Sequence, residues 1–220
     1  MNTILSASII AADYNQLGAE IQRVASAGAD MIHFDVMDHH YVPSLSIGPD
    51  VCASLAKQSP LPIEAHLMVT NPDSYINAFA NAGATMLTVH PSTCPDPNMT
   101  LQAIVDAGMK AGLAFNPDQS PMQYEALLHK VDIILLMSVF PGFCGQAFID
   151  TTLDKIKVMR DWLNQHKKSA YLAVDGGIKT HNIQSCAKAG ADFFVMGSGI
   201  FAQESYSKTI KTIRQNLAEN

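Results

Sequence analysis

The stretch Ala27-Gly28-Ala29-Asp30-Met31-Ile32-His33-Phe34-Asp35-Val36-Met37 contains the pattern from which the fold is predicted. Its glycine suits the left-handed residue that closes a helix, and the run Met31–Met37 is rich in strand-forming residues. The same junction returns as Ala82-Gly83-Ala84-Thr85 and Ala189-Gly190-Ala191-Asp192, with a looser copy at Ala107-Gly108-Met109-Lys110. Each copy stands between a helical pattern and a short apolar run. We therefore expect each junction to end a helix and start a strand.

Strand-like runs alternate with helical periodicity along the whole chain, as in Leu17-x-x-Glu20-Ile21-x-x-Val24. The predicted strands are Ile4–Ile10, Met31–Met37, Ile63–Met68, Met86–Val89, Ala111–Phe115, Ile133–Met137, Tyr171–Val174 and Phe193–Met196. Eight strands in βαβ units fit a closed (β/α)8 TIM barrel, with an open doubly wound sheet as the alternative. Ser8–Tyr14, after the first strand, contains no glycine, so the dinucleotide-binding fingerprint Gly-x-Gly-x-x-Gly is missing.

Composition and charge limit the classes of partner and the domain organisation that we expect. The 220 residues carry a net charge of −6 and no run of Lys or Arg longer than Lys167-Lys168, so we expect neither a nucleic-acid nor a membrane partner. No linker divides residues 1–220, which predicts a single domain. There is no leader peptide pattern and no membrane-spanning stretch, and none of the scattered cysteines forms a Cys-x-x-Cys pair. We expect reduced thiols and a cytoplasmic location.

Candidate metal ligands stand at predicted strand ends, where a barrel carries its active site. Side chains alternate along a strand, so His33 and Asp35 share one face while their apolar neighbours share the other. His66 lies in the third strand, and Asp175 follows the seventh. Imidazole and carboxylate groups together form a plausible site for a divalent metal. Structural histidines held by hydrogen bonds are the alternative interpretation.

Glycine-rich segments follow three predicted strands in a row: Pro141–Gln146, Gly176-Gly177 and Gly197-Ser198-Gly199. Backbone N–H groups exposed by glycines, beside a helix N-terminus, can bind a phosphate dianion. Barrels often hold phosphate at the loops after strands seven and eight. Taken together, the adjacent loops favour a phosphate site over simple tight turns. Met37, Met68 and Met137 at strand ends either fill the core or line a pocket, and core filling is the simpler reading.

The sequence resembles the ribulose-phosphate 3-epimerase family over essentially its whole length. The motifs that carry the resemblance are Ser8-Ile-Ile-Ala-Ala-Asp13, His33-Phe-Asp-Val-Met-Asp38, Val42-Pro43 with Ile47-Gly48-Pro49, His66-Leu-Met-Val69, Leu136-Met-Ser-Val139, Pro141-Gly-Phe-Cys-Gly-Gln146 and Val174-Asp-Gly-Gly177. The resemblance implies a barrel of the ribulose-phosphate-binding type. It also implies interconversion of D-ribulose 5-phosphate and D-xylulose 5-phosphate, as in the pentose phosphate pathway, and assembly into a homo-oligomer.

The resemblance further implies the site. His33, Asp35, His66 and Asp175 would hold one divalent metal ion, which could be zinc, iron, manganese or cobalt. Asp35 and Asp175 would be the acid/base pair, one on each face of the sugar, acting through a metal-stabilised enediolate. His66 would also contact the substrate, and Ser8 would either contact the substrate or support the two aspartates. The remaining substrate contacts would come from an apolar floor of three methionines and from the phosphate-binding loops: Met37, Met68, Met137, Gly142, Phe143, Cys144, Gly145, Gly176, Gly177, Gly197 and Ser198.

The chain departs from the family at several positions. Cys144 and His39 replace residues that are usually Gly, and Phe140 replaces one that is often polar. Ala7 and Ala11 replace a common Pro and Ser. If the backbone at Cys144 has positive φ, we expect strain there. An exposed Cys144 would also be an oxidation-sensitive thiol.

Three other functions remain open from the sequence. Allulose-6-phosphate 3-epimerase would use the same site on a substrate one carbon longer. A barrel hydrolase would use a metal-bound hydroxide but would have no need of three glycine-rich loops. A barrel that binds sugar phosphate without turnover is the third.

Overall fold

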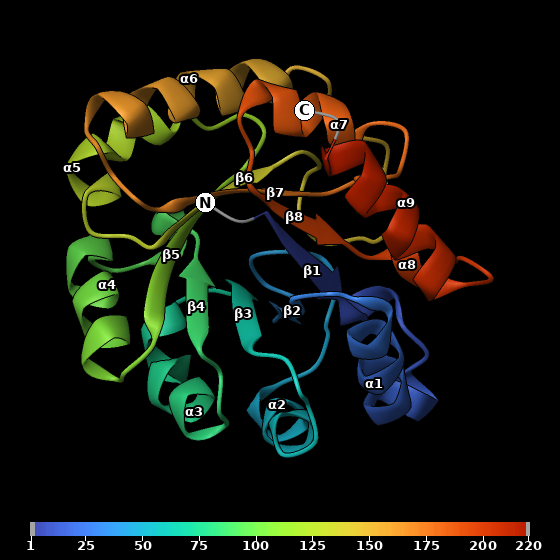
Figure 1. Ribbon diagram of the computed structural model, residues 1–220. Coiled ribbons are helices and arrows are strands. Elements are labelled where there is room, and N and C mark those ends of the chain that lie inside the picture. Colours follow the sequence, from blue (N-terminus) through green and yellow to red (C-terminus); the bar gives the residue numbers. More distant parts are fainter. Residues whose placement is uncertain (1–2, 219–220) are drawn as a thin grey trace.

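Eight parallel strands close into one barrel, because β8 pairs with β1 as well as with β7 (Figure 1). The computed structural model describes residues 3–218. The strands are β1 (Ile4–Ser8), β2 (Met31–Met37), β3 (Ile63–Met68), β4 (Met86–Val89), β5 (Lys110–Phe115), β6 (Ile133–Met137), β7 (Tyr171–Asp175) and β8 (Phe193–Met196). The predicted (β/α)8 TIM barrel is confirmed, and the open sheet is wrong. That residues 1–220 form a single domain stays a prediction.

Helices surround the barrel (Figure 1). They are α1 (Leu17–Ala27), α2 (Pro49–Ala56), α3 (Ile76–Asn81), α4 (Pro97–Asp106), α5 (Glu125–Leu128), α6 (Thr152–Gln165), α7 (Ile183–Ala189), α8 (Ser198–Phe201) and α9 (Tyr206–Ala218), with 3-10 turns η1 (Ile9–Ala11), η2 (Tyr14–Gln16), η3 (Pro72–Tyr75), η4 (Pro91–Thr93) and η5 (Pro121–Tyr124). The first strand is shorter than predicted, because the chain turns into η1 after Ser8. In residues 3–218, no helix is both long and apolar enough to cross a bilayer.

The inside of the barrel is divided into a polar and an apolar half. Strands β1–β4 contribute the buried polar side chains Ser6, Ser8, His33, Asp35, Glu64, His66 and Thr88. Strands β5–β8 contribute apolar ones: Ala114, Ile133, Leu135, Met137, Ala173, Phe193 and Val195. Between strands and helices, a second core contains large residues such as Phe34 and Phe79. The polar half of the barrel, together with Asp175 at the end of β7, therefore offers the groups available for chemistry.

The Ala-Gly-Ala junctions close helices as predicted. Gly28 ends α1 with φ 101° and Gly190 ends α7 with φ 115°, a backbone region that L side chains avoid. The aspartates that follow tie neighbouring strands together. Asp30 accepts a hydrogen bond from the Leu5 backbone N–H at 2.7 Å, and Asp192 accepts one from the Leu172 N–H at 2.8 Å.

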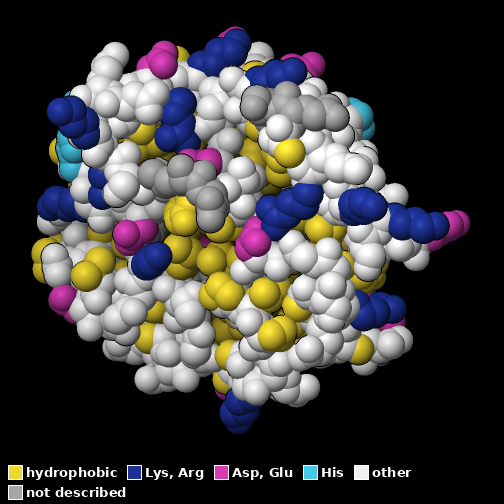
Figure 2. Space-filling view, in the orientation of Figure 1, with side chains coloured by type: hydrophobic (Ala, Val, Ile, Leu, Met, Phe, Trp, Pro, Cys, Tyr) yellow, Lys and Arg dark blue, Asp and Glu magenta, His cyan; other side chains and the backbone are white. Residues whose placement is uncertain are grey.

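Two of these junctions are each bound by a separate arginine. Arg160 in α6 donates to the Gly190 carbonyl at 2.7 Å and pairs with Asp192 at 2.7 Å. Arg214 in α9 donates to the Gly28 carbonyl at 2.9 Å and pairs with Asp30 at 2.5 Å. Figure 2 shows Lys and Arg side chains spread around the face that it draws, with hydrophobic side chains nearer its centre. The junctions lie at the starts of the strands, opposite the strand ends that carry the candidate site.

Candidate active site

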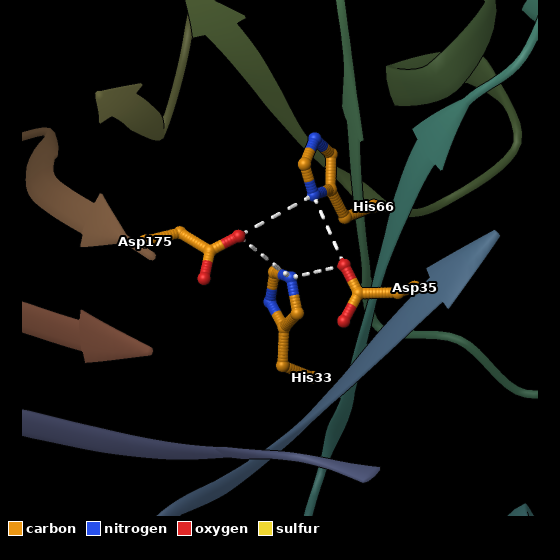
Figure 3. A group of neighbouring side chains, drawn as sticks. All are labelled: His33, Asp35, His66 and Asp175. Atoms are coloured by element: carbon orange, nitrogen blue, oxygen red, sulfur yellow. Dashed lines mark hydrogen bonds and ion pairs between the residues drawn. The ribbon is translucent and has the colours of Figure 1, made fainter. Parts of the chain in front are cut away.

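Four predicted ligands come together at the carboxyl ends of the strands (Figure 3). His33 and Asp35 come from β2, His66 from β3 and Asp175 from the end of β7. One nitrogen or carboxylate oxygen from each lies within 4.8 Å of the others, and no second such group occurs among residues 3–218. Asp35 and His66 are direct neighbours in the β2–β3 register. Strand alternation and barrel closure therefore bring the four side chains together.

The distances within this group suit a small cation. His33 Nε2 lies 3.1 Å from Asp35 Oδ1 and 3.7 Å from Asp175 Oδ2. His66 Nδ1 lies 3.4 Å and 3.9 Å from the same two oxygens. His66 Nδ1 is buried and has no hydrogen-bond partner among the described residues. A buried nitrogen without a partner, facing two carboxylates, fits a divalent metal ligand.

Glu64 orients His33 from behind. Its carboxylate contacts His33 Nδ1, so Nε2 is the ring nitrogen that faces Asp35 and Asp175. Burial alone would lower the pKa of His33, but the Glu64 and Asp35 carboxylates raise it well above 6.5. Glu64 is not among the residues predicted from the sequence. Strand alternation carried the signal, because Glu64 shares a face with His66 and pairs in register with His33.

The two aspartates have different environments. Burial would raise the pKa of Asp35, but His33 and His66 outweigh it and hold this pKa below its usual range. Ser8 Oγ also donates a hydrogen bond to Asp35 Oδ2 at 2.6 Å. At Asp175, burial and the nearby Asp35 and Glu64 charges raise the pKa to about 6, against the opposing influence of His33 and His66. Before any metal binds, one carboxyl is thus ionised and the other holds a proton more readily, a pattern typical of acid/base pairs.

Nearly all the predicted site residues line one cavity. The predicted residues on its wall are Ser8, Asp35, Met37, Met68, Met137, Gly142, Phe143, Cys144, Gly145, Asp175, Gly176, Gly177, Gly197 and Ser198. His33 and His66 are not on the wall and are fully buried. Pro141, Gln146 and Gly199, which belong to the predicted glycine-rich segments, also line the cavity, whereas the wall residues Ile10, Ala11, Val139, Ile178 and Val195 were not predicted. Apolar wall residues give no signal in a sequence that distinguishes them from core.

The glycines after β7 have a steric reason. Gly177 has φ +65°, and a Cβ there would lie 2.5 Å from the Phe148 backbone nitrogen. Gly176 has φ +112°, and a Cβ there would lie 2.4 Å from Val139 Cγ2. The backbone after β7 therefore packs directly against the segment that follows β6. Lys179, which sequence analysis also missed, donates to Ser198 Oγ at 2.7 Å and adds a cation beside the Gly197-Ser198 turn.

The methionines both fill the core and line the cavity. Met37 and Met68 are almost fully buried and pack with Val42, while Met137 belongs to the apolar half of the barrel. All three also reach the cavity wall. The two readings of these residues are therefore compatible.

Backbone strain lies at His39. Cys144 does not have a positive φ, so the condition under which strain was expected there is not met. Among residues 3–218, the non-glycine residues with positive φ are His39 at 59°, Asn71 and Lys167. His39 Nδ1 contacts the Pro43 carbonyl at 2.6 Å, which helps to hold the strained turn. Cys144 is exposed, but burial of its thiol and the charges of Asp35 and Asp175 raise its pKa to about 11. A thiol that stays protonated near neutral pH is a poor target for oxidation.

His90 is the other important residue to which sequence analysis gave no role. It follows β4, is fully buried, and its Nε2 lies 3.0 Å from His66 Nε2. Burial and the neighbouring His66 lower the pKa of His90 well below 6.5, so it is neutral. Asn116, also left without a role, donates to Tyr41 Oη at 2.9 Å, and the Tyr41 ring packs on His90.

Comparison with known proteins connects this site to a family. The family model described as the ribulose-phosphate 3 epimerase family matches residues 4–201. Ribulose-phosphate 3-epimerase of Escherichia coli (strain K12) is 47% identical over 218 residues, covering 98% of this chain and 96% of the relative. The Aquifex aeolicus (strain VF5) enzyme of the same name is 40% identical, covering 96% of each chain. Among solved structures, 3-hexulose-6-phosphate synthase from Salmonella typhimurium has a TM-score of 0.71 at 19% identity, covering 98% of this chain and 99% of that one, which shows a shared fold alone.

Proposed function

The chain belongs to the ribulose-phosphate 3-epimerase family, and from that premise we propose that it interconverts D-ribulose 5-phosphate and D-xylulose 5-phosphate with one divalent metal ion. It is an isomerase that acts on sugar phosphates. The observation that carries the proposal is the cluster of His33, Asp35, His66 and Asp175 beside a cavity lined by glycine-rich loops.

The proposed metal ligands are His33 Nε2, His66 Nδ1 and one oxygen each of Asp35 and Asp175. Two imidazoles and two carboxylates accept zinc, iron, manganese or cobalt. A bound cation would act as a Lewis acid and stabilise the negative charge that develops on the sugar oxygens. Since His33 has a raised pKa, its Nε2 must release its proton before it can bind a metal.

Asp35 and Asp175 are the proposed proton carriers. Epimerisation at carbon 3 removes a proton next to a ketone and returns one to the opposite face. Two carboxyl groups on different strands, β2 and β7, can serve the two faces without rotation of the intermediate. The ionised Asp35 would accept the proton while a protonated Asp175 donates, and the reverse reaction exchanges their roles. Ser8 would hold Asp35 in place through its 2.6 Å hydrogen bond.

The phosphate would be bound by backbone N–H groups of the glycine-rich loops. Gly176, Gly177, Gly197 and Ser198 line the same cavity as the aspartates, which supports this role. The β6–α6 segment would cover the substrate with Gly142, Phe143, Cys144 and Gly145. The three methionines would form an apolar floor near the reacting carbons.

An epimerase assay with metal removal tests the proposal. Chelation should abolish the interconversion, and adding back a divalent ion should restore it. Solvent deuterium should appear at carbon 3 during turnover. Asp35→Asn and Asp175→Asn should each lower kcat by at least about 100-fold. Full activity in a protein shown by elemental analysis to be metal-free would refute the requirement for a metal ion. Full activity of both variants would refute the two-aspartate mechanism.

The alternative substrate is allulose 6-phosphate, which differs by one carbon at the same site. The ratio of kcat/KM for the pentulose and hexulose phosphates decides between them, and we expect it to favour the pentulose. Because the chain belongs to an isomerase family, we no longer consider the hydrolase or the barrel that only binds sugar phosphate. A cytoplasmic location and assembly into a homo-oligomer stay predictions.

A further inference from the structure

The two histidines of the cluster differ in what lies behind them. Histidines that bind metals commonly donate their other ring N–H to a carboxylate or a carbonyl, and His33 follows that pattern with Glu64. Behind His66 lies a second imidazole, with 3.0 Å between His66 Nε2 and His90 Nε2. His90 has no part in the proton transfers described above. The unusual partner therefore calls for its own explanation.

Metal binding through His66 Nδ1 would require one particular protonation of this histidine pair. A neutral imidazole carries its proton on one ring nitrogen and a lone pair on the other. His66 can bind a metal through Nδ1 only when its proton is on Nε2. That N–H then points at His90 Nε2, which must present a lone pair and carry its own proton on Nδ1. In the opposite arrangement His90 Nε2 would donate, and the His66 proton would occupy Nδ1, where the metal binds.

We propose that His90 is a positioning residue, whose Nε2 accepts the His66 Nε2–H and so holds His66 in the tautomer that turns its Nδ1 lone pair toward Asp35 and Asp175. The inference rests on the proposed metal site. His90 acts through His66 and touches neither the substrate nor the metal position. His90 would thus orient His66 in the same way that Glu64 orients His33.

The packing around His90 leaves its ring little freedom. His90 and His66 are both fully buried, and their rings meet edge to edge through the two nitrogens, with centroids 5.1 Å apart and an interplanar angle of 28°. The Tyr41 ring packs on His90 with centroids 5.0 Å apart. Asn116 in turn anchors Tyr41 through the 2.9 Å bond to its hydroxyl. The acceptor nitrogen is therefore held in place by contacts from the segments that follow β2, β4 and β5.

Substitutions that keep or remove the acceptor test this role. The amide oxygen of Gln can reach the position of Nε2, whereas the shorter Asn matches the position of Nδ1, and Leu has no acceptor. We expect His90→Gln to bind cobalt or zinc within about threefold of the parent, and His90→Asn and His90→Leu to bind about 10–100-fold more weakly. Titration of the chelated, metal-free proteins by calorimetry measures these affinities. Circular dichroism confirms that each variant is folded.

Nitrogen NMR of the zinc-loaded, histidine-labelled protein gives a second readout. The parent should show the His66 proton on Nε2 and the His90 proton on Nδ1. Should Asn or Leu fail to fold, this spectrum of the parent alone decides, and the opposite tautomers would overturn the proposal. Equal metal affinity in the parent and in a folded His90→Leu would also overturn it while leaving the metal site intact. A parent protein that binds no metal would instead refute the proposed metal site itself. The two failures are therefore distinguishable.

Discussion

At the scale of single residues, the site is built at some expense of stability. Asp175 lies among buried groups of like charge, and its pKa is raised from 3.8 to about 6 chiefly by burial. The folded chain thus binds this proton more tightly than the unfolded chain does. The resulting contribution to stability is fully present below about pH 3.8 and is lost as the pH rises through about 6.

The substitution Asp175→Asn should therefore stabilise the metal-free protein at high pH. At about pH 8 we expect the free energy of unfolding to rise on the order of 2 kcal/mol, and the gain should disappear near pH 4. Thermal unfolding of chelated parent and variant across this pH range measures the difference. In the metal-loaded proteins the order should reverse, because the parent gains ligand-binding energy. A metal-free parent that is the more stable of the two at pH 8 would contradict this account.

At the scale of elements, the loops after β6 and β7 depend on each other. The Gly177 backbone lies so close to Phe148 that a Cβ would meet the Phe148 nitrogen at 2.5 Å and its Cα at 2.8 Å. The β6–α6 segment is held independently by Gln146, whose side-chain amide donates to the carbonyls of Phe140 and Phe143 at 2.7 Å and 3.0 Å. Neither backbone can move away without disturbing the cavity wall.

Gly177→Ala should accordingly displace the proposed phosphate loop. We expect KM for the sugar phosphate to rise about 10-fold or more, with a smaller change in kcat, because the loop binds substrate and transition state alike. Steady-state kinetics measures both. Gly48→Ala is the matched control, since nothing lies within 4 Å of a Cβ at Gly48 and its φ of −125° suits any residue. If Gly177→Ala changed the kinetics no more than Gly48→Ala, the close approach of Gly177 to Phe148 would not matter for function.

At the scale of the whole molecule, the barrel separates stability from chemistry. The reacting groups lie at the carboxyl ends of the strands, while the Ala-Gly-Ala-Asp junctions lie at the opposite ends. There Arg160 and Arg214 each bind a glycine carbonyl and an aspartate, so that α6 and α9 clamp the starts of neighbouring strands. In barrels of this kind, residues at that face contribute to stability rather than to catalysis.

Removing either clamp should lower stability and leave catalysis unchanged. We expect Arg160→Met and Arg214→Met each to lose about 1–3 kcal/mol of unfolding free energy, because partly buried charged hydrogen bonds are lost. We also expect kcat/KM to stay within about twofold of the parent. Lys157→Met is the control, because the Lys157–Asp154 pair is largely exposed, at 61% and 80%, and should contribute almost nothing. Loss of activity in a folded arginine variant would contradict the separation.

The (β/α)8 barrel and the candidate ligands His33, Asp35, His66 and Asp175 could be predicted from the sequence by itself. Apart from the end of β1, the approximate strand positions, the glycines that end α1 and α7, and the shared face of His33 and Asp35 follow from local rules, because side-chain alternation and left-handed glycine depend only on nearby residues. The tertiary structure alone decided which groups stand behind the ligands. Glu64 reaches His33 and His90 reaches His66 across strands, and such pairs depend on register and on closure of the barrel. Closure likewise set the raised pKa of Asp175, since burial and the charges that cause it come from other strands.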